Sequence, residues 1–190
     1  YVELNTLRRG LEMPIILVTH DLDEAAMLAD SMSVIHHGQT LQQGSPEQVL
    51  HQPDNSAVAN QVDIRNLFVG TLIKEKGVTY LQWQDASFKI LQPEGFAVGQ
   101  ALFWTISPAK VLLHQRVRPS RGENENPVTG IIREMITLRG ITTVLLDVGQ
   151  RSKLTLQMDL PEHVAIRNSL KLGEEITVSI LSEAIHLMAH

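Results

Sequence analysis

Ile15-Ile16-Leu17-Val18-Thr19-His20-Asp21, followed by Leu22-Asp23-Glu24-Ala25, is the stretch that decides how the first part of this chain folds. A short apolar run that ends in polar residues is typical of a β-strand buried on both faces, as in a parallel sheet. Asp21 and Glu24 are three residues apart and match a capping box, which predicts that a helix begins immediately. We therefore expect His20 at the carboxyl end of a buried strand, where open α/β sheets place their ligands.

The composition is that of a globular protein with one large or two small domains. The chain has 190 residues, of which 43% are hydrophobic and 19% are charged, so it can build a core. A formal net charge of −5 argues against a general binder of nucleic acid or anionic membranes. The absence of cysteine excludes disulfides and thiolate metal sites. No apolar run approaches the roughly 20 residues that cross a bilayer, and Tyr1 opens no signal-peptide pattern, so we expect any membrane role to come through a partner.

The residues up to about 66 predict a mixture of helices and one hairpin. Amphipathic spacing, a Gly turn and a Ser-Pro-Glu-Gln capping box predict a helix over 2–11, a helix over 22–30, strands over 32–35 and 40–42 around His37-Gly38, and a helix from Ser45 through Leu50. The segment from Pro53 to about Asn66 is expected to be a linker.

From Leu67 onward the pattern changes to short strands that occur in two copies. Period-two alternation, as in Leu154, Leu156 and Met158, indicates half-buried strands of small barrels or sandwiches. Without a gap, Gly99 to His114 aligns with Gly173 to Met188, and Thr71 to Glu75 aligns with Gly130 to Glu134. The sequence thus predicts a duplicated β-unit, with residues 116–126 joining the copies.

Residues 1–60 resemble the last part of an ABC importer ATPase. The resemblance rests on Val18-Thr19-His20-Asp21 with Glu24-Ala25, on the hairpin from Val34 to Gly44, and on Ser45-Pro-Glu-Gln-Val-Leu50, which follow in the family's order. It implies that His20 is the switch histidine, a catalytic and ATP-binding residue whose imidazole senses the γ-phosphate and helps to place the attacking water. The alternative is a histidine that merely ends a strand, and the surrounding motifs favour the nucleotide role.

The rest of the ATPase machinery is absent from the sequence. It contains no phosphate-binding loop, no Walker B strand and no signature motif. We therefore expect the chain to begin partway through an ATPase domain and to be unable to hydrolyse ATP by itself. ATP and Mg²⁺ would be cofactors of the longer protein, and none is expected for this chain.

Other polar residues have structural interpretations. His36 and His37 are adjacent and should point to opposite faces of a strand, so they cannot share a metal. The remaining histidines outside the switch segment are expected at the surface or at strand edges, Glu123 and Glu125 in a solvated loop, and no metal site is expected. Trp83 and Trp104 fall in strand patterns and should be core or interface anchors.

Residues 67–190 resemble the C-terminal TOBE region of importers for molybdate, sulfate, iron, polyamines or sugars. Ile106-Ser-Pro-Ala-Lys-Val-Leu-Leu113 carries this resemblance, and the second copy is most similar to the molybdate-binding version. In that version a Ser-Ala-Arg-Asn motif and an Ile-Lys-Ala-Ser motif bind the oxyanion. Only Asn126 is retained from the first motif, and Leu181 replaces the lysine of the second. Carboxylates in place of donors would repel a dianion, so a structural or dimerising role is favoured over anion binding.

Together these observations predict an α+β protein. Its expected parts are the tail of a P-loop NTPase α/β domain over residues 1–60, followed by an all-β OB-like (TOBE) domain of two repeated units, 61–119 and 120–190. The implied partners are membrane permease subunits and a second copy of the chain, on the cytoplasmic inner face of the cell membrane, without nucleic acid or direct membrane insertion. The alternative is a free-standing oxyanion sensor. Because the sheet fragment at residues 1–44 lacks its neighbouring strands, we expect it to be frayed or covered by another copy.

Overall fold

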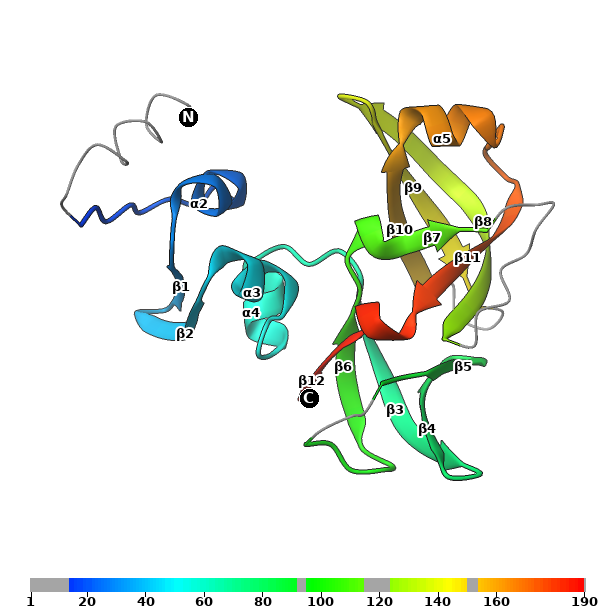
Figure 1. The fold of residues 1–190 in the computed structure, drawn as a ribbon, viewed down its shortest axis with the longest axis horizontal. Coiled ribbons are helices and arrows are strands. Elements are labelled where there is room, and N and C mark those ends of the chain that lie inside the picture. Colours follow the sequence, from blue (N-terminus) through cyan, green and yellow to red (C-terminus); the bar gives the residue numbers. More distant parts are fainter. Residues whose placement is uncertain (1–13, 92–94, 115–123, 150–153, 190) are drawn as a thin grey trace. The chain divides into compact units, whose positions relative to one another are not determined.

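The chain divides into two compact units, residues 1–64 and residues 65–190. The computed structural model describes residues 14–91, 95–114, 124–149 and 154–189, drawn as ribbon in Figure 1. The helix expected over residues 2–11 lies outside the described residues. Each unit is described by itself below.

The buried strand expected at Ile15–Val18 is not formed, and this prediction is wrong. Residues 14–20 have no regular secondary structure, and Ile16 and Val18 are each 92% exposed. A strand is buried on both faces only when neighbouring strands pair with it. Within the described part of this unit, the only strands are β1 (Met32–His36) and β2 (Gln39–Gly44), and they pair with each other. The segment therefore has the right composition for a central strand but no sheet to enter.

The helices of the first unit follow local capping signals. α2 spans Leu22–Leu28 and α3 spans Pro46–His51, and at α3 Ser45 and Gln48 complete the expected capping box. A further helix, α4 (Ser56–Gln61), occupies the segment that we expected to be a linker, because the Asn55 side chain caps it. Its buried Val58 joins a small core of valines: Val34, Val49, Val58 and Val62.

The hairpin β1–β2 confirms the predicted turn. His37 and Gly38 both have positive φ, 48° and 76°, which is the backbone that a two-residue turn between antiparallel strands requires. The prediction that His36 and His37 point to opposite faces is wrong, because His37 lies in the turn and its ring contacts that of His36 with centroids 4.0 Å apart.

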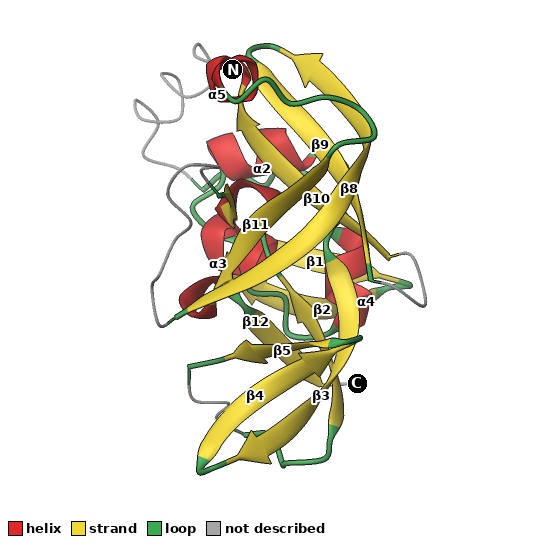
Figure 2. Cartoon of the chain, turned by 90° about the vertical axis from the view of Figure 1, so that its right-hand side faces the viewer, coloured by secondary structure: helices red, strands yellow, loops and turns green. Residues whose placement is uncertain are grey.

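The second unit contains two five-stranded antiparallel sheets (Figures 1 and 2). The first sheet has the order β5-β4-β3-β6-β12 and the second has the order β10-β9-β8-β11-β7. The strands are β3 (Leu67–Glu75), β4 (Val78–Trp83), β5 (Ala86–Lys89), β6 (Ala101–Thr105), β7 (Val111–Leu113), β8 (Glu125–Leu138), β9 (Ile141–Val148), β10 (Leu154–Pro161), β11 (Glu175–Leu181) and β12 (His186–Ala189). The helical segments are η1 (Pro108–Lys110), α5 (Glu162–Arg167) and η2 (Ser182–Ala184).

The sheet orders show the predicted duplication and an exchange of strands. Strands β3 to β6 of the first copy occupy the same places as β8 to β11 of the second copy. The last strand of each copy crosses over, so that β7 pairs with β11 and β12 pairs with β6. The two copies are therefore interlocked in one compact unit rather than placed one after the other.

The register of the repeat differs from our alignment by one residue at its start. Gly70, rather than Thr71, corresponds to Gly130. A Cβ at Gly70 would lie 2.6 Å from Leu81 Cδ1, and a Cβ at Gly130 would lie 2.8 Å from Val148 Cγ1, so only glycine fits at both positions. The equivalence is confirmed two residues later, where the carbonyls of Leu72 and Ile132 accept from Gly99 and Gly173, at 2.7 and 2.8 Å.

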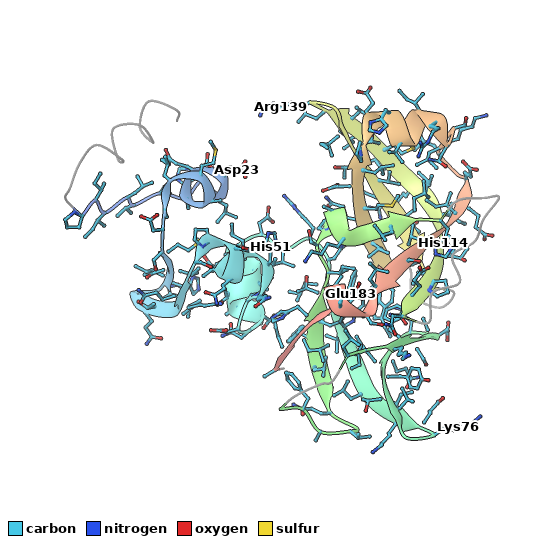
Figure 3. All side chains as sticks on the ribbon, in the orientation of Figure 1. Asp23, His51, Lys76, His114, Arg139 and Glu183 are labelled. Atoms are coloured by element: carbon cyan, nitrogen blue, oxygen red, sulfur yellow. The ribbon has the colours of Figure 1, made fainter. Side chains whose placement is uncertain are left out.

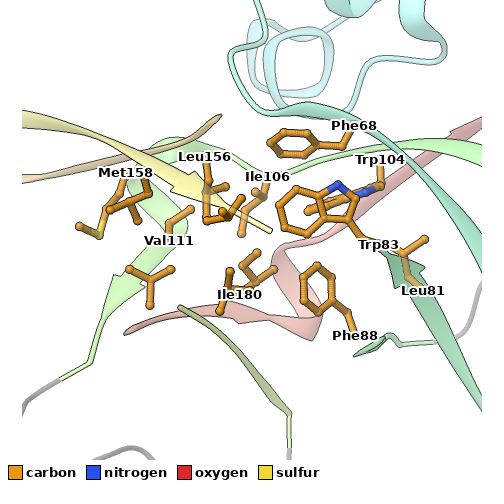
Figure 4. Close-up of a cluster of buried hydrophobic side chains, with 14 of the residues drawn as sticks. Phe68, Leu81, Trp83, Phe88, Trp104, Ile106, Val111, Leu156, Met158 and Ile180 are labelled. Carbon is orange, nitrogen blue, oxygen red and sulfur yellow. The ribbon is translucent and has the colours of Figure 1, made fainter. Parts of the chain in front are cut away.

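One hydrophobic core serves both copies. Buried side chains from the two sheets, including Phe68, Trp104, Leu156 and Ile180, belong to a single cluster (Figure 4). Trp83 and Trp104 are 3% and 0% exposed and meet edge to face with ring centroids 5.2 Å apart, which confirms their predicted place in the core. Because the core is shared, neither copy has a separate set of buried residues.

Candidate functional site

His20 is exposed and lies directly before α2. Residues 14–19, which have no regular secondary structure, lead into His20, and Asp21, the N-cap of α2, follows it. The exposed imidazole therefore lies beside the N-terminus of α2. The strand that should fix its direction is not formed, so the chain supplies the side chain but not the surrounding sheet.

Three side chains around His20 hold the start of α2. The Asp21 carboxylate accepts from the Glu24 N–H at 3.0 Å, as the capping box predicts. The Glu24 carboxylate instead accepts from Thr19 Oγ1 at 2.6 Å, and Thr19 Oγ1 accepts from the Asp21 N–H at 3.0 Å. In a capping box the Asp21 N–H would bond directly to the Glu24 carboxylate. Here the Thr19 hydroxyl lies between these two groups and connects the residues on both sides of His20.

Asn126, the residue retained from the anion-binding motif, is buried and fully engaged. Its Nδ2 donates to the carbonyls of Lys89 at 3.1 Å and Ile180 at 2.8 Å, and its Oδ1 accepts from the Lys89 N–H at 2.7 Å. An asparagine amide has two N–H donors, and both are used here. In this conformation no donor of Asn126 is left for an anion.

Asn66 makes the same set of bonds in the first copy, and no sequence motif predicted it. Its Nδ2 donates to the carbonyls of Ile106 at 3.1 Å and Gln157 at 2.8 Å, and its Oδ1 accepts from the Gln157 N–H at 2.8 Å. Asn66 and Asn126 lie at equivalent places, just before β3 and near the start of β8. Each amide binds the backbone of a strand from the other copy, so the two asparagines connect the two copies in equivalent ways.

His114, Ser179 and Glu125 form a polar cluster where β7 leaves the second sheet (Figure 3 labels His114). Ser179 Oγ lies within hydrogen-bond reach of His114 Nε2 and donates to Glu125 Oε2 at 3.3 Å, and Nε2 is 3.8 Å from Oε2. The hydroxyl and the carboxylate face the same ring nitrogen, whereas a nucleophilic triad needs them on opposite nitrogens. The cluster therefore fits a structural role.

One prediction about these residues is wrong, because Glu125 begins strand β8 instead of lying in a solvated loop. His114 directly follows β7, the edge strand of its sheet, and a strand edge is one of the two places expected for it. Glu123 lies outside the described residues.

Ser182 also lacks a hydroxyl proton for a ligand, because its Oγ lies 2.6 Å from the Lys89 carbonyl and 3.0 Å from the Asn124 carbonyl.

Within the part of the chain that the structure describes, no group of three or more histidine, aspartate or glutamate side chains could hold a metal ion. No described helix is long and apolar enough to cross a membrane.

Known proteins similar to this chain are import ATP-binding proteins. The spermidine/putrescine import ATP-binding protein PotA of Borrelia garinii subsp. bavariensis is 29% identical over 187 residues, which is 98% of this chain and 48% of that protein. The Fe(3+) ions import ATP-binding protein FbpC 2 of Rhizobium meliloti is 26% identical over 193 residues, with the same two coverages. The homologues of this chain are therefore the ATP-binding proteins of ABC importers. The chain spans about half the length of these relatives, and no protein-family model matches it.

The fold also has a neighbour among solved structures. The cytoplasmic molybdate-binding protein ModG, in a form with molybdate bound, matches with a TM-score of 0.57 and 18% identity. The match covers 67% of this chain and 97% of that protein. The likeness shows that the matched part of this chain shares the mostly β, OB-like fold of that protein.

Proposed function

We propose that the chain is the C-terminal part of the ATP-binding subunit of an ABC importer. The observation that carries this proposal is its similarity to PotA and FbpC 2 over nearly its whole length. In such a protein, residues 1–60 complete the ATPase domain and the β-unit is a regulatory or dimerising domain, with permease subunits and a second copy as partners at the cytoplasmic face of the membrane. ATP and Mg²⁺ would bind to a phosphate loop outside this chain.

His20 is the residue through which this function can be tested. In a protein that carries this chain behind a phosphate-binding loop, His20 would contact the γ-phosphate and help to place the attacking water. His20→Ala is then expected to lower ATP hydrolysis about 100-fold while ATP binding is retained. His51→Ala, which changes another exposed histidine of the same unit, is the matched control. Equal hydrolysis by the two variants would contradict the role of His20.

The likeness to ModG supports oxyanion binding as a second candidate. The donors of Asn126 and Ser182 are already used, and Leu181 brings no charge, so we expect no tight binding of molybdate or sulfate. Titration calorimetry of the chain with each anion tests this expectation. Tight binding would contradict this expectation and would favour the sensor function.

A further inference from the structure

We propose that the open edge of strand β8 at residues 133–138 is the surface through which two copies of this chain associate. This inference rests on the homodimer in the proposed function and names its contact. Strand β8 pairs with β11 only from Glu125 to Ile131, and the last bonds on that side join Ile132 to residues 173 and 174. Beyond this point, β9 is the only strand that pairs with β8 among the described residues.

The open edge has backbone groups that can pair with another strand. The turn at Arg139-Gly140 has two residues with positive φ, and the residues that flank such a turn bond to each other. The backbone N–H and C=O groups therefore point toward β9 at Leu138 and Ile136. At Met135 and Thr137 these groups point away from β9. An exposed row of this kind is a template for pairing with another chain.

The outer face beside this edge is aliphatic. Ile136, Leu138 and Ile141 are 53%, 69% and 46% exposed, and the register places Leu138 opposite Ile141. Figure 3 labels Arg139 at the tip of the hairpin that carries them.

The first copy provides an internal comparison. Its equivalent edge continues for only three residues beyond Leu72, and two of these, Lys74 and Glu75, are charged and exposed. Charged, short edges are how proteins prevent strand pairing. The edge of the second copy also begins with two charged, exposed residues, Arg133 and Glu134, but it continues for four more residues that include the exposed Ile136 and Leu138. This difference between the copies points to a contact made by the second copy alone.

A second copy of the chain is complementary to this edge. Two identical antiparallel edges related by a two-fold axis present donors to acceptors. When Ile136 lies on the two-fold axis, Met135 of one copy pairs with Thr137 of the other. In the same register, Glu134 of one copy faces Leu138 of the other. Arg139 follows Leu138, so it lies next to this Glu134. Glu134 and Arg139 make no ion pair within the described residues, so each is available to the other chain. Arg133 is compensated by Asp147, 3.5 Å away.

The test is sedimentation velocity of the 190-residue chain over a range of concentrations. The wild type is expected to form dimers, and Ile136→Lys is expected to raise the dissociation constant at least about tenfold, because two lysines would meet at the axis. Ile131→Lys is the matched control. Ile131 is 48% exposed on the same strand, but β8 is paired on both sides there, so this variant should dimerise like the wild type.

Charge reversal provides a second, independent readout. Glu134→Arg and Arg139→Glu should each weaken the dimer, and the double variant should restore it. A dimer that is unaffected by Ile136→Lys would overturn the proposed edge but not the homodimer. A wild type that stays monomeric at all concentrations would refute the homodimer and with it this contact.

Discussion

At the scale of single residues, Asn66 and Asn126 connect the two copies through buried side-chain amides. Asn126→Ala would remove the acceptor of the part-buried Lys89 N–H and a donor to the buried Ile180 carbonyl. We expect the free energy of unfolding to fall by about 2–3 kcal/mol, measured by chemical denaturation. Asn66→Ala should have a similar effect, since its bonds are equivalent. Asn124→Ala, at an exposed position two residues away, should change stability by less than about 0.5 kcal/mol.

The same residues show where prediction from sequence stops. The caps formed by Asp21 and Ser45 bond to residues three positions along the chain, so their spacing predicts them. Asn66 bonds to Gln157, 91 residues away, and nothing in the local pattern identifies such a partner. Asn126 was singled out through a resemblance, which suggested a ligand where the structure has two strand backbones.

At the scale of elements, strand identity was predictable and strand partners were not. Alternation predicted β10 from Leu154, Leu156 and Met158, and the repeat alignment predicted matching strands in the first copy. The exchange of β7 and β12 depends on which sheet edge is open after folding. A strand alternates with a period of two in either sheet, so alternation cannot show which sheet it joins. Helix α4 was missed for a different reason: residues such as Pro53 and Asn55 favour turns as well as helix caps.

The exchanged strand β7 can be tested through the cluster that holds its end. Ser179→Ala removes the hydroxyl that joins His114 to Glu125. We expect the amides of Val111–Leu113 to exchange with solvent about fivefold faster, because one part-buried hydrogen bond contributes roughly 1 kcal/mol to closing the strand. Thr177→Ala, on the same strand, removes only an exposed contact with Thr129 and should leave these rates unchanged. Equal rates in the two variants would show that β7 is held without the cluster.

At the scale of the whole molecule, the two units differ in how far their hydrophobic residues are buried. The β-unit has a shared core that includes four aromatic side chains, Phe68, Trp83, Phe88 and Trp104, and its end strands interlock its two copies. The first unit has a core of four buried valines and leaves the segment at Ile15–Val18 exposed. The sequence predicted a buried strand in this segment because of its apolar run, but it could not show whether a sheet is present to receive it.

Limited proteolysis should distinguish the two units. Proteases cleave extended segments that lack backbone hydrogen bonds and side-chain burial, and residues 14–20 have these properties. We expect the first cuts to fall within this segment, while residues 124–149 and 154–189 stay intact, as mass spectrometry of the fragments would show. Equal resistance of both units would instead indicate that another chain covers the segment. Repeating the digestion over a range of protein concentrations separates these cases, since cover by a second copy would weaken on dilution.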